Sequence, residues 1–245
     1  MRIMIGILLM SGKGKRFSDV GYKTPKPLIS VFGKPMFINS LNSFPKFEKL
    51  YLVTTDIVSN NKMFIDSLDE IKTDYEVISL KETTSGQAES CYLAAKYIEN
   101  NKPFFVGPCD FELKSQINLD SLFLNNEEII IVTYTPKQIN LDFPNNYGWV
   151  ESDRGSLVKK IEVKSNSSIN KENSKIISGI FLFKNKEIFE NYFKIMKVKK
   201  IKVNNEYYLD SLCKIALEEG SKVVYLNTHE GVSYGTPQEV TFLDD

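Results

Sequence analysis

Histidine and cysteine are scarce in this sequence. The 245 residues include one histidine, His229, and three cysteines, Cys91, Cys109 and Cys213. The cysteines are widely spaced and include no Cys-x-x-Cys pair, which disfavours both a disulfide framework and a zinc knuckle. A Ser-His-Asp or Cys-His mechanism would depend entirely on His229. Because this residue lies in a polar segment that predicts an exposed loop, we expect neither mechanism.

An excess of charge and a long apolar run are also absent. Lys and Arg number 31, equal to the 31 Asp and Glu, so the net charge favours neither a nucleic acid nor an anionic membrane as a partner. The apolar run at residues 3–10 is far shorter than the roughly 20 residues that span a bilayer, and its basic residues follow it. We therefore expect no signal peptide, no membrane anchor and a cytoplasmic location.

Short apolar runs alternate with amphipathic segments in the first half of the chain. Runs rich in β-branched and aromatic residues predict buried strands at residues 3–10, 50–54, 75–80, 103–107 and 128–134. Residues 87–99 place apolar side chains on one face of a predicted helix. Alternation of strand and helix at this pitch favours a mostly parallel sheet covered on both sides.

The second half of the chain predicts a hairpin inserted into this pattern. Its strands are expected at residues 147–151 and 157–163, and are followed by a strand at 176–183, a helix at 207–219 that ends at Gly220, and a strand at 222–226. The polar residues 164–174 are the best candidate for a mobile loop. We therefore expect one α/β domain over residues 1–245, a three-layer sandwich with a mixed sheet and an inserted β-hairpin.

A glycine-containing turn follows the first predicted strand. Residues 11–14, Ser-Gly-Lys-Gly, would point backbone N–H groups toward the carboxyl edge of the sheet, where such groups bind phosphate oxygens. The turn is not a P-loop, because Gly6 and Gly12 enclose five residues and Lys13 precedes a glycine. It is not a dinucleotide-binding loop either, because Phe17 stands at the third glycine position.

Three charged side chains are candidates for catalysis. Arg16 and Lys26 would place fixed positive charge against the phosphates of a substrate. Asp110 follows the predicted strand at 103–107, and ligands of open α/β sheets bind at such strand ends. We predict that Asp110 binds Mg²⁺, which needs only one or two carboxylates besides phosphate oxygens and water. Glu112 is a second candidate ligand.

These segments resemble the signature of the sugar-phosphate nucleotidyltransferase superfamily. The resemblance extends over nearly the whole chain and is clearest in Gly-x-Gly-x-Arg-Phe at 12–17 with Gly-Tyr at 21–22, Pro-Lys-Pro-Leu at 25–28, and Gly-Lys-Pro-Met at 33–36. The Gly-Tyr insert resembles the branch found in bacterial capsule gene clusters. The methylerythritol-phosphate cytidylyltransferases, a neighbouring branch, usually have Pro-Lys-Gln in place of Pro-Lys-Pro.

The resemblance implies a fold, a reaction and a division of the chain. The fold would be of the GT-A type, similar to the Rossmann fold. The enzyme would use Mg²⁺ to join a nucleoside triphosphate, with CTP, UTP or dTTP favoured, to a sugar phosphate or similar small acceptor, and would release pyrophosphate. Residues 1–135 would bind the nucleotide and residues 136–245 the acceptor.

The resemblance also implies which residues contact each substrate. The positions that match nucleotide contacts are Leu9, Met10, Ser11, Gly12, Lys13, Gly14, Lys15, Thr84, Gly86 and Gln87. The positions that match acceptor contacts are Tyr147, Gly148, Trp149, Glu162, Lys164 and Gly179. Thr84 or Ser85 is also a candidate cap for the helix at 87–99.

The chain departs from the family pattern at two places. The family usually has adjacent Glu and Lys on the acceptor side, whereas Val163 separates Glu162 from Lys164. A regular strand would put these two side chains on one face. Either the strand is bulged or the glutamate contact is lost, and Lys164 is the stronger candidate. Ser233 stands where a metal-binding aspartate is often found, with Asp210 and Glu230 as candidate substitutes.

Two other functions remain open at this point. A GT-A glycosyltransferase would use Asp110-Phe-Glu112 as an acidic metal motif and a nucleotide sugar as donor, although it would not need the triphosphate loop. A non-catalytic sensor of nucleotides or nucleotide sugars would tolerate the substitutions at Val163 and Ser233. Because little sequence follows Gly-Thr-Pro at 235–237, we expect no β-helix acyltransferase domain. A homodimer is compatible with these features.

Overall fold

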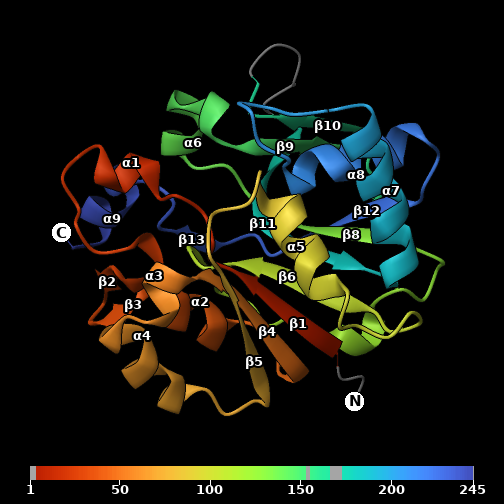
Figure 1. Cartoon of the computed structure of the whole chain (residues 1–245). Coiled ribbons are helices and arrows are strands. Elements are labelled where there is room, and N and C mark those ends of the chain that lie inside the picture. The colour runs from red at the N-terminus through yellow and green to blue at the C-terminus, as the bar shows by residue number, and fades with distance from the viewer. Residues whose placement is uncertain (1–3, 153–154, 166–172, 245) are drawn as a thin grey trace.

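Parallel strands form one side of a central sheet (Figure 1). The computed structural model describes residues 4–152, 155–165 and 173–244. Four neighbouring strands of the sheet are parallel. In spatial order they are β6 (Phe104–Pro108), β1 (Met4–Leu9), β4 (Phe47–Thr55) and β5 (Tyr75–Leu80). The side chains of β1 and β6 are buried throughout, as expected for strands covered on both faces. The four strands predicted for this region are confirmed.

Strand β11, Ser174–Phe183, makes the sheet mixed. It lies antiparallel to three neighbours, β6, β8 and β9. The other strands of this sheet are β8 (Ile129–Tyr134), β9 (Gly148–Glu151), β10 (Lys160–Val163) and β12 (Val223–Asn227). The antiparallel pair β9 and β10 is the predicted hairpin. Residues 153–154 of its turn and residues 166–172 of the predicted mobile loop lie outside the described residues.

Helices cover both faces of the sheet and enclose two apolar cores. On one face lie α5 (Gln87–Ala95), α7 (Lys186–Val198) and α8 (Leu209–Glu218), which Figure 1 shows grouped together. The other core includes residues of α2 (Met36–Ser43), α3 (Asp56–Ser59) and α4 (Lys62–Ser67). Helix α5 ends at Ala95 rather than at residue 99, although Ile98 remains buried as predicted.

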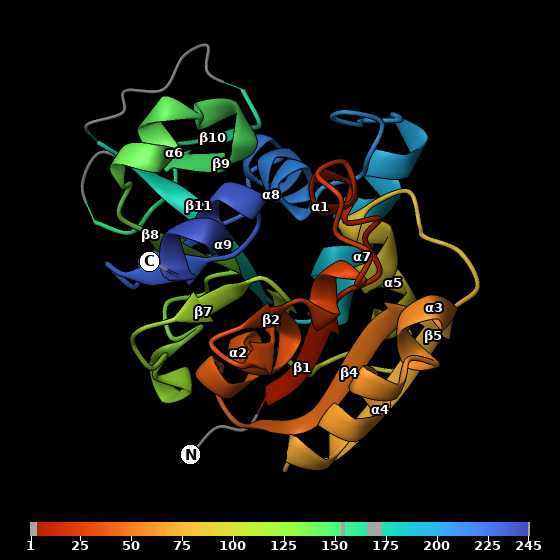
Figure 2. The ribbon, with the colours of Figure 1, turned by 90° about the vertical axis from the view of Figure 1, so that its left-hand side faces the viewer.

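A third, smaller cluster connects the start of the chain to its last helix. Phe17 in α1 (Lys15–Ser18) and Val240 in α9 (Pro237–Asp244) are both buried in it, together with Tyr234. Figures 1 and 2 both show α1 near α9. The sequence interpretation did not include α7 or α9.

Short elements complete the described fold. Two small antiparallel ladders pair β2 (Ser30–Val31) with β3 (Lys34–Pro35), and β7 (Phe111–Leu113) with β13 (Gly231–Ser233). The other helical segments are α6 (Gln138–Asp142) and the 3₁₀ turns at Lys26–Leu28, Leu68–Glu70, Leu119–Ser121 and Pro144–Asn146. The turn at Lys26–Leu28 places Lys26 beside the carboxyl ends of β1 and β6.

Candidate active site

A cavity of about 860 Å³ opens at the carboxyl ends of β1 and β6. Every residue predicted to act in catalysis or in nucleotide binding lines it, as do Tyr147, Gly148, Lys164 and Gly179 of the predicted acceptor set. Two predicted acceptor residues, Trp149 and Glu162, do not line it. The strand ends explain this convergence, because parallel strands present their carboxyl ends at one edge of the sheet.

The glycine turn after β1 brings its backbone close to Lys26. Gly14 adopts the left-handed conformation, with φ of 61°. A Cβ atom at this position would lie 3.0 Å from Lys26 Cβ, so the absence of a side chain permits the close approach. A Cβ atom at Gly12 would meet nothing within 4 Å. The turn therefore leaves open space beside Gly12 and packs tightly at Gly14, as expected for a loop that accommodates a phosphate chain.

Hydroxyl groups connect the glycine turn to the loop before α5. Ser11 Oγ lies 2.7 Å from Ser90 Oγ, and Ser90 Oγ lies 2.7 Å from Thr84 Oγ1. Thr84 Oγ1 also donates to the carbonyl oxygen of Gly86 at 2.9 Å. These bonds fix the position of the predicted base-binding loop relative to the predicted triphosphate-binding turn.

The prediction that Thr84 or Ser85 caps α5 is wrong. The N-cap is Gly86, with φ of 133°, and no side chain caps the helix there. Instead, the carboxylate of Glu89, in the first turn, accepts a 2.7 Å bond from the backbone N–H of Ser85. A glycine is needed at the N-cap because the chain takes a backbone conformation there that is almost unique to glycine.

Lys26 and Asp110 form an ion pair in the cavity. Their side chains are 19% and 22% exposed, so each remains accessible to a ligand. Burial acts to lower the pKa of Lys26, but the carboxylate of Asp110 raises it above the ordinary value. Lys26 therefore carries its positive charge at neutral pH. The backbone N–H of Tyr234 donates to the carbonyl oxygen of Asp110 at 2.8 Å and fixes the carboxyl end of β6.

Side-chain oxygens of Asp110, Ser233 and Glu239 lie around Gly235. A Cβ atom on Gly235 would lie 3.3 Å from Asp110 Oδ2, and 3.5 Å from both Ser233 Oγ and Glu239 Oε2. Glu239 accepts hydrogen bonds of 3.0 Å from the Tyr147 hydroxyl and from the Thr236 hydroxyl. The sequence interpretation missed Glu239, although the Thr-x-x-Glu spacing at 236–239 is a helix-start signal.

This donor set fits a hard cation. Within the described ranges, no group of three or more His, Cys, Asp or Glu side chains could hold a metal ion by itself. Mg²⁺ commonly takes one or two carboxylates and completes its shell with substrate phosphates and water. Asp110, with Ser233 and Glu239 nearby, therefore fits an ion that arrives with a triphosphate.

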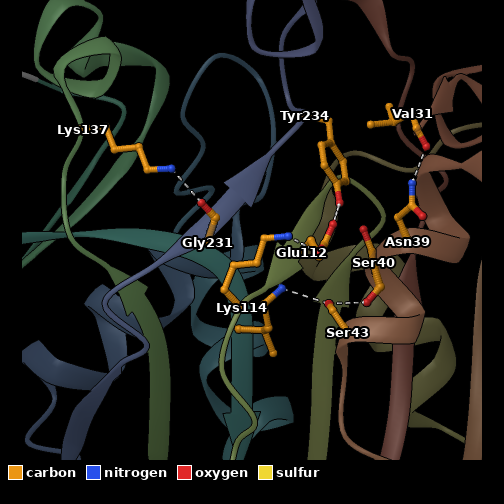
Figure 3. A network of polar contacts seen from close by, with 10 residues as sticks. Val31, Asn39, Ser40, Ser43, Glu112, Lys114, Lys137, Gly231 and Tyr234 are labelled. Carbon is orange, nitrogen blue, oxygen red and sulfur yellow. Dashed lines mark hydrogen bonds and ion pairs between the residues drawn. The ribbon is translucent and has the colours of Figure 1, made fainter. Parts of the chain in front are cut away.

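Glu112 and Glu230 lie elsewhere. Glu112 accepts a 2.7 Å bond from the hydroxyl of Tyr234 and pairs with Lys114, as Figure 3 shows. Glu230 is exposed, and neither carboxylate lines the cavity. Glu112 instead stabilises the ladder of β7 and β13, which holds the segment around Gly235 against Asp110.

Lys164 enters the cavity because strand β10 ends at the residue before it. Lys164 has φ of 49°, which turns the chain out of the strand. Its ammonium donates to the carbonyl oxygen of Asn146 at 2.7 Å. The side chain of Glu162 instead pairs with Lys160 at 3.3 Å and with Lys214 at 4.0 Å. The two side chains thus do not share a face, and Lys164 alone reaches the cavity.

Trp149 lies inside the core rather than in the cavity. It is 1% exposed, and its indole N–H donates to the carbonyl oxygen of Pro144 at 2.9 Å. Its neighbour Gly148 lines the cavity, since successive residues of a strand point to opposite faces. Trp149 therefore positions this strand without reaching a ligand.

Neither His229 nor Cys109 supports a Ser-His-Asp or Cys-His mechanism in the cavity. His229 is exposed and does not line it, as the sequence predicts. Cys109 does line it, but burial raises the pKa of its thiol to about 12. Because the thiolate is the reactive form, Cys109 is unreactive at neutral pH.

Curated relatives show sequence similarity over almost all of this chain. The bifunctional protein GlmU of Staphylococcus saprophyticus is 28% identical over 226 residues, which are 91% of this chain and 48% of GlmU. GlmU of Staphylococcus epidermidis is 27% identical over 220 residues, 88% of this chain and 46% of that protein. The chain thus spans about half the length of the curated relatives it matches.

Solved structures share the fold. A nucleoside-diphosphate-sugar pyrophosphorylase from Vibrio cholerae RC9 superposes with a TM-score of 0.75 at 20% identity, covering 98% of this chain and 99% of that one. The inositol-1-phosphate CTP transferase of T. maritima gives 0.73 at 18% identity, covering 99% and 95%. The family model described as Nucleotidyl transferase matches residues 5–231. This chain belongs to the nucleotidyl transferase family.

Proposed function

We propose that this protein transfers the nucleotidyl group of a nucleoside triphosphate to a small phosphorylated acceptor, a sugar phosphate or a similar compound. A phosphate oxygen of the acceptor attacks the α-phosphorus and forms a new O–P bond. The bond from the α-phosphorus to the oxygen that bridges to the β-phosphate breaks, and pyrophosphate leaves. The triphosphate is CTP, UTP or dTTP, and the product serves surface polysaccharide synthesis.

The convergence of positive charge on one cavity carries this proposal. Arg16, Lys26 and Lys164 line the same cavity as the glycine turn and Asp110. Two phosphorylated substrates repel each other, so catalysis requires that their charges be neutralised and their reacting atoms brought together. An acceptor phosphate is already a nucleophile and needs no general base, which fits a cavity without histidine.

The two halves of the chain bind different substrates. The glycine turn and the loop before α5, both in residues 1–135, bind the triphosphate and its base. Lys164 and the backbone of Gly148, both in residues 136–245, bind the acceptor. Mg²⁺ held by Asp110 and the phosphates would neutralise charge as it develops on the leaving pyrophosphate. The names of two fold neighbours pair a nucleotide with a sugar and CTP with inositol 1-phosphate, the substrate classes proposed here.

Pyrophosphate release tests the proposal directly. The assay crosses CTP, UTP, dTTP, GTP and ATP with a panel of sugar, polyol and aminoalcohol phosphates in the presence of Mg²⁺. We expect release that requires one triphosphate and one acceptor together. A nucleotide sugar consumed without pyrophosphate release would indicate a glycosyltransferase. Nucleotide binding without any turnover would indicate a sensor, and either result would contradict the proposal.

Acceptor binding is expected to weaken in alkaline solution. Burial lowers the pKa of Lys164 below 10.5, and Arg16 acts in the same direction, while the carboxylates of Asp210, Asp110 and Glu206 oppose it. Above this pKa the ammonium is neutral and no longer attracts a phosphate. The KM for the acceptor should therefore rise as the pH increases from about 7 to about 10, and should change less in Lys164→Gln. The same profile in both proteins would remove Lys164 from the acceptor site.

A further inference from the structure

Asp210, the other candidate substitute for the metal-binding aspartate, is a buried carboxylate in the acceptor half of the cavity, and the proposed function gives it no role. It lies in the first turn of α8, is 7% exposed and lines the cavity with Lys164 and Tyr208. A Cβ atom on Gly148 would lie 2.1 Å from Asp210 Oδ2. The missing side chain of Gly148 therefore leaves the space that this carboxylate occupies.

The described side chains do not satisfy this carboxylate. The hydrogen bond that stabilises its charge comes from its own backbone N–H, and Lys164 acts on it as a nearby charge. The ammonium of Lys164 instead donates to the carbonyl oxygen of Asn146. Burial raises the pKa of Asp210, and Lys164 acts in the opposite direction. A buried carboxylate without side-chain donors is costly unless water or a ligand in the cavity supplies hydrogen bonds.

The surroundings determine which donors suit it. The ammonium of Lys164 acts on Asp210 as a nearby charge, and it would repel a second cation placed beside the same carboxylate. The ring of Tyr208 is not free for a quaternary ammonium either, because Lys164 Nζ lies over it at 5.2 Å from the centroid. Uncharged hydroxyl groups can donate to the carboxylate without this repulsion. Their hydrogen bonds to a charged acceptor are stronger than those between neutral groups.

We propose that Asp210 is a specificity-determining residue, whose carboxylate binds hydroxyl groups of a sugar or polyol phosphate while Lys164 pairs with the phosphate. This assignment rests on the proposed function for the location of the acceptor. It predicts that the hydroxyl groups, and not the phosphate alone, supply much of the acceptor affinity. It also predicts that aminoalcohol phosphates with a quaternary ammonium are poor ligands.

Calorimetric titration of the whole protein tests this without relying on turnover. The probes are glucose 1-phosphate, glycerol 3-phosphate, n-butyl phosphate, phosphocholine and inorganic phosphate. Wild-type protein should bind at least one of the two hydroxylated phosphates about tenfold more tightly than n-butyl phosphate and phosphocholine. Asp210→Asn should lose about tenfold in affinity for that compound. Its affinity for inorganic phosphate should stay equal or increase, because a negative charge beside Lys164 is removed.

The matched control is Asp66→Asn, an exposed aspartate on α4 far outside the cavity lining, and it should bind every probe as wild type does. Equal binding of n-butyl and hydroxylated phosphates by the wild type, or no binding of either, overturns the inference even if Asp210→Asn fails to fold. Pyrophosphate release is scored separately. Hydroxyl-dependent binding without turnover would contradict the proposed reaction but support the role of Asp210. Turnover with phosphocholine alone would support the reaction and contradict the role of Asp210.

Discussion

Replacing Lys26 with Met is expected to slow pyrophosphate release about a thousandfold. The substitution keeps an unbranched apolar stem, which can still pack over Phe17, where Lys26 Nζ lies 5.6 Å from the ring centroid. It removes the positive charge that faces Asp110 and, in the proposed reaction, the negative charge that grows on the phosphates. The measurement is the initial rate with the triphosphate and acceptor identified by the substrate grid.

Lys34→Met is the matched control for this substitution. Lys34 also pairs with a carboxylate, that of Glu70, but its side chain is 47% exposed and does not line the cavity. Exposed ion pairs contribute little to stability, about 0 to 1 kcal/mol, so this variant should turn over as wild type does. Circular dichroism would verify that both variants fold. A folded Lys26→Met variant with a rate within tenfold of wild type would remove Lys26 from the catalytic machinery.

The elements that the sequence predicts best are those whose pattern is local. The strand at Tyr75–Leu80 has the predicted bounds, because turn residues delimit its apolar run on both sides. Helix α7 was missed although its buried residues Phe189, Phe193 and Met196 follow helical spacing. Its flanking lysines obscure the pattern in the sequence, and its burial depends on contacts with α5 and α8 that only the assembled fold provides.

In the candidate site, too, residues placed by a local motif are predictable from the sequence, whereas residues placed by tertiary contacts are not. Residues next to a strand end or in a glycine turn, such as Gly14 and Asp110, are predictable because the motif itself fixes their place at the sheet edge. The place of Glu162 is not, because its carboxylate pairs with Lys160 and with Lys214, a residue of α8 some 50 positions away, instead of lining the cavity with Lys164. Asp210 is the clearest example of a placement that depends on tertiary structure. Its carboxylate occupies space that exists because Gly148, some 60 residues away in the chain, has no side chain.

The loop before α5 is also built around a contact that is invisible in the sequence. The backbone N–H of Tyr207 donates to the carbonyl oxygen of Ser85 at 2.8 Å, and that of Ala88 donates to the carbonyl oxygen of Tyr207 at 2.9 Å. Gly86 lies between these two bonds. A Cβ atom there would lie 2.5 Å from the nitrogen and 2.7 Å from the oxygen of Tyr207. Because both are backbone atoms, no side-chain rotation can relieve the contact.

Gly86→Ala is therefore expected to destabilise the protein by about 4 kcal/mol. The backbone conformation contributes about 1 to 3 kcal/mol of strain, and the forced separation from Tyr207 a similar amount. For a chain of this size, the melting temperature should fall by roughly 10 °C. Thermal unfolding followed by circular dichroism measures it. The separation would also move α5 away from the segment that precedes Asp210, so nucleotide and acceptor affinities should both decrease.

Gly33→Ala serves as a control that has backbone strain but no close contact of the added Cβ atom. Gly33 also has a positive φ, 78°, in the turn between β2 and β3, but a Cβ atom there would meet nothing within 4 Å. This variant should therefore lose only the conformational term, about 1 to 2 kcal/mol, and should keep its ligand affinities. If the two variants melted at the same temperature, the contact between Gly86 and Tyr207 would contribute nothing to stability. A larger loss in Gly86→Ala, accompanied by weaker binding of both nucleotide and acceptor, would support a role of this contact in holding the two substrate-binding halves of the cavity together.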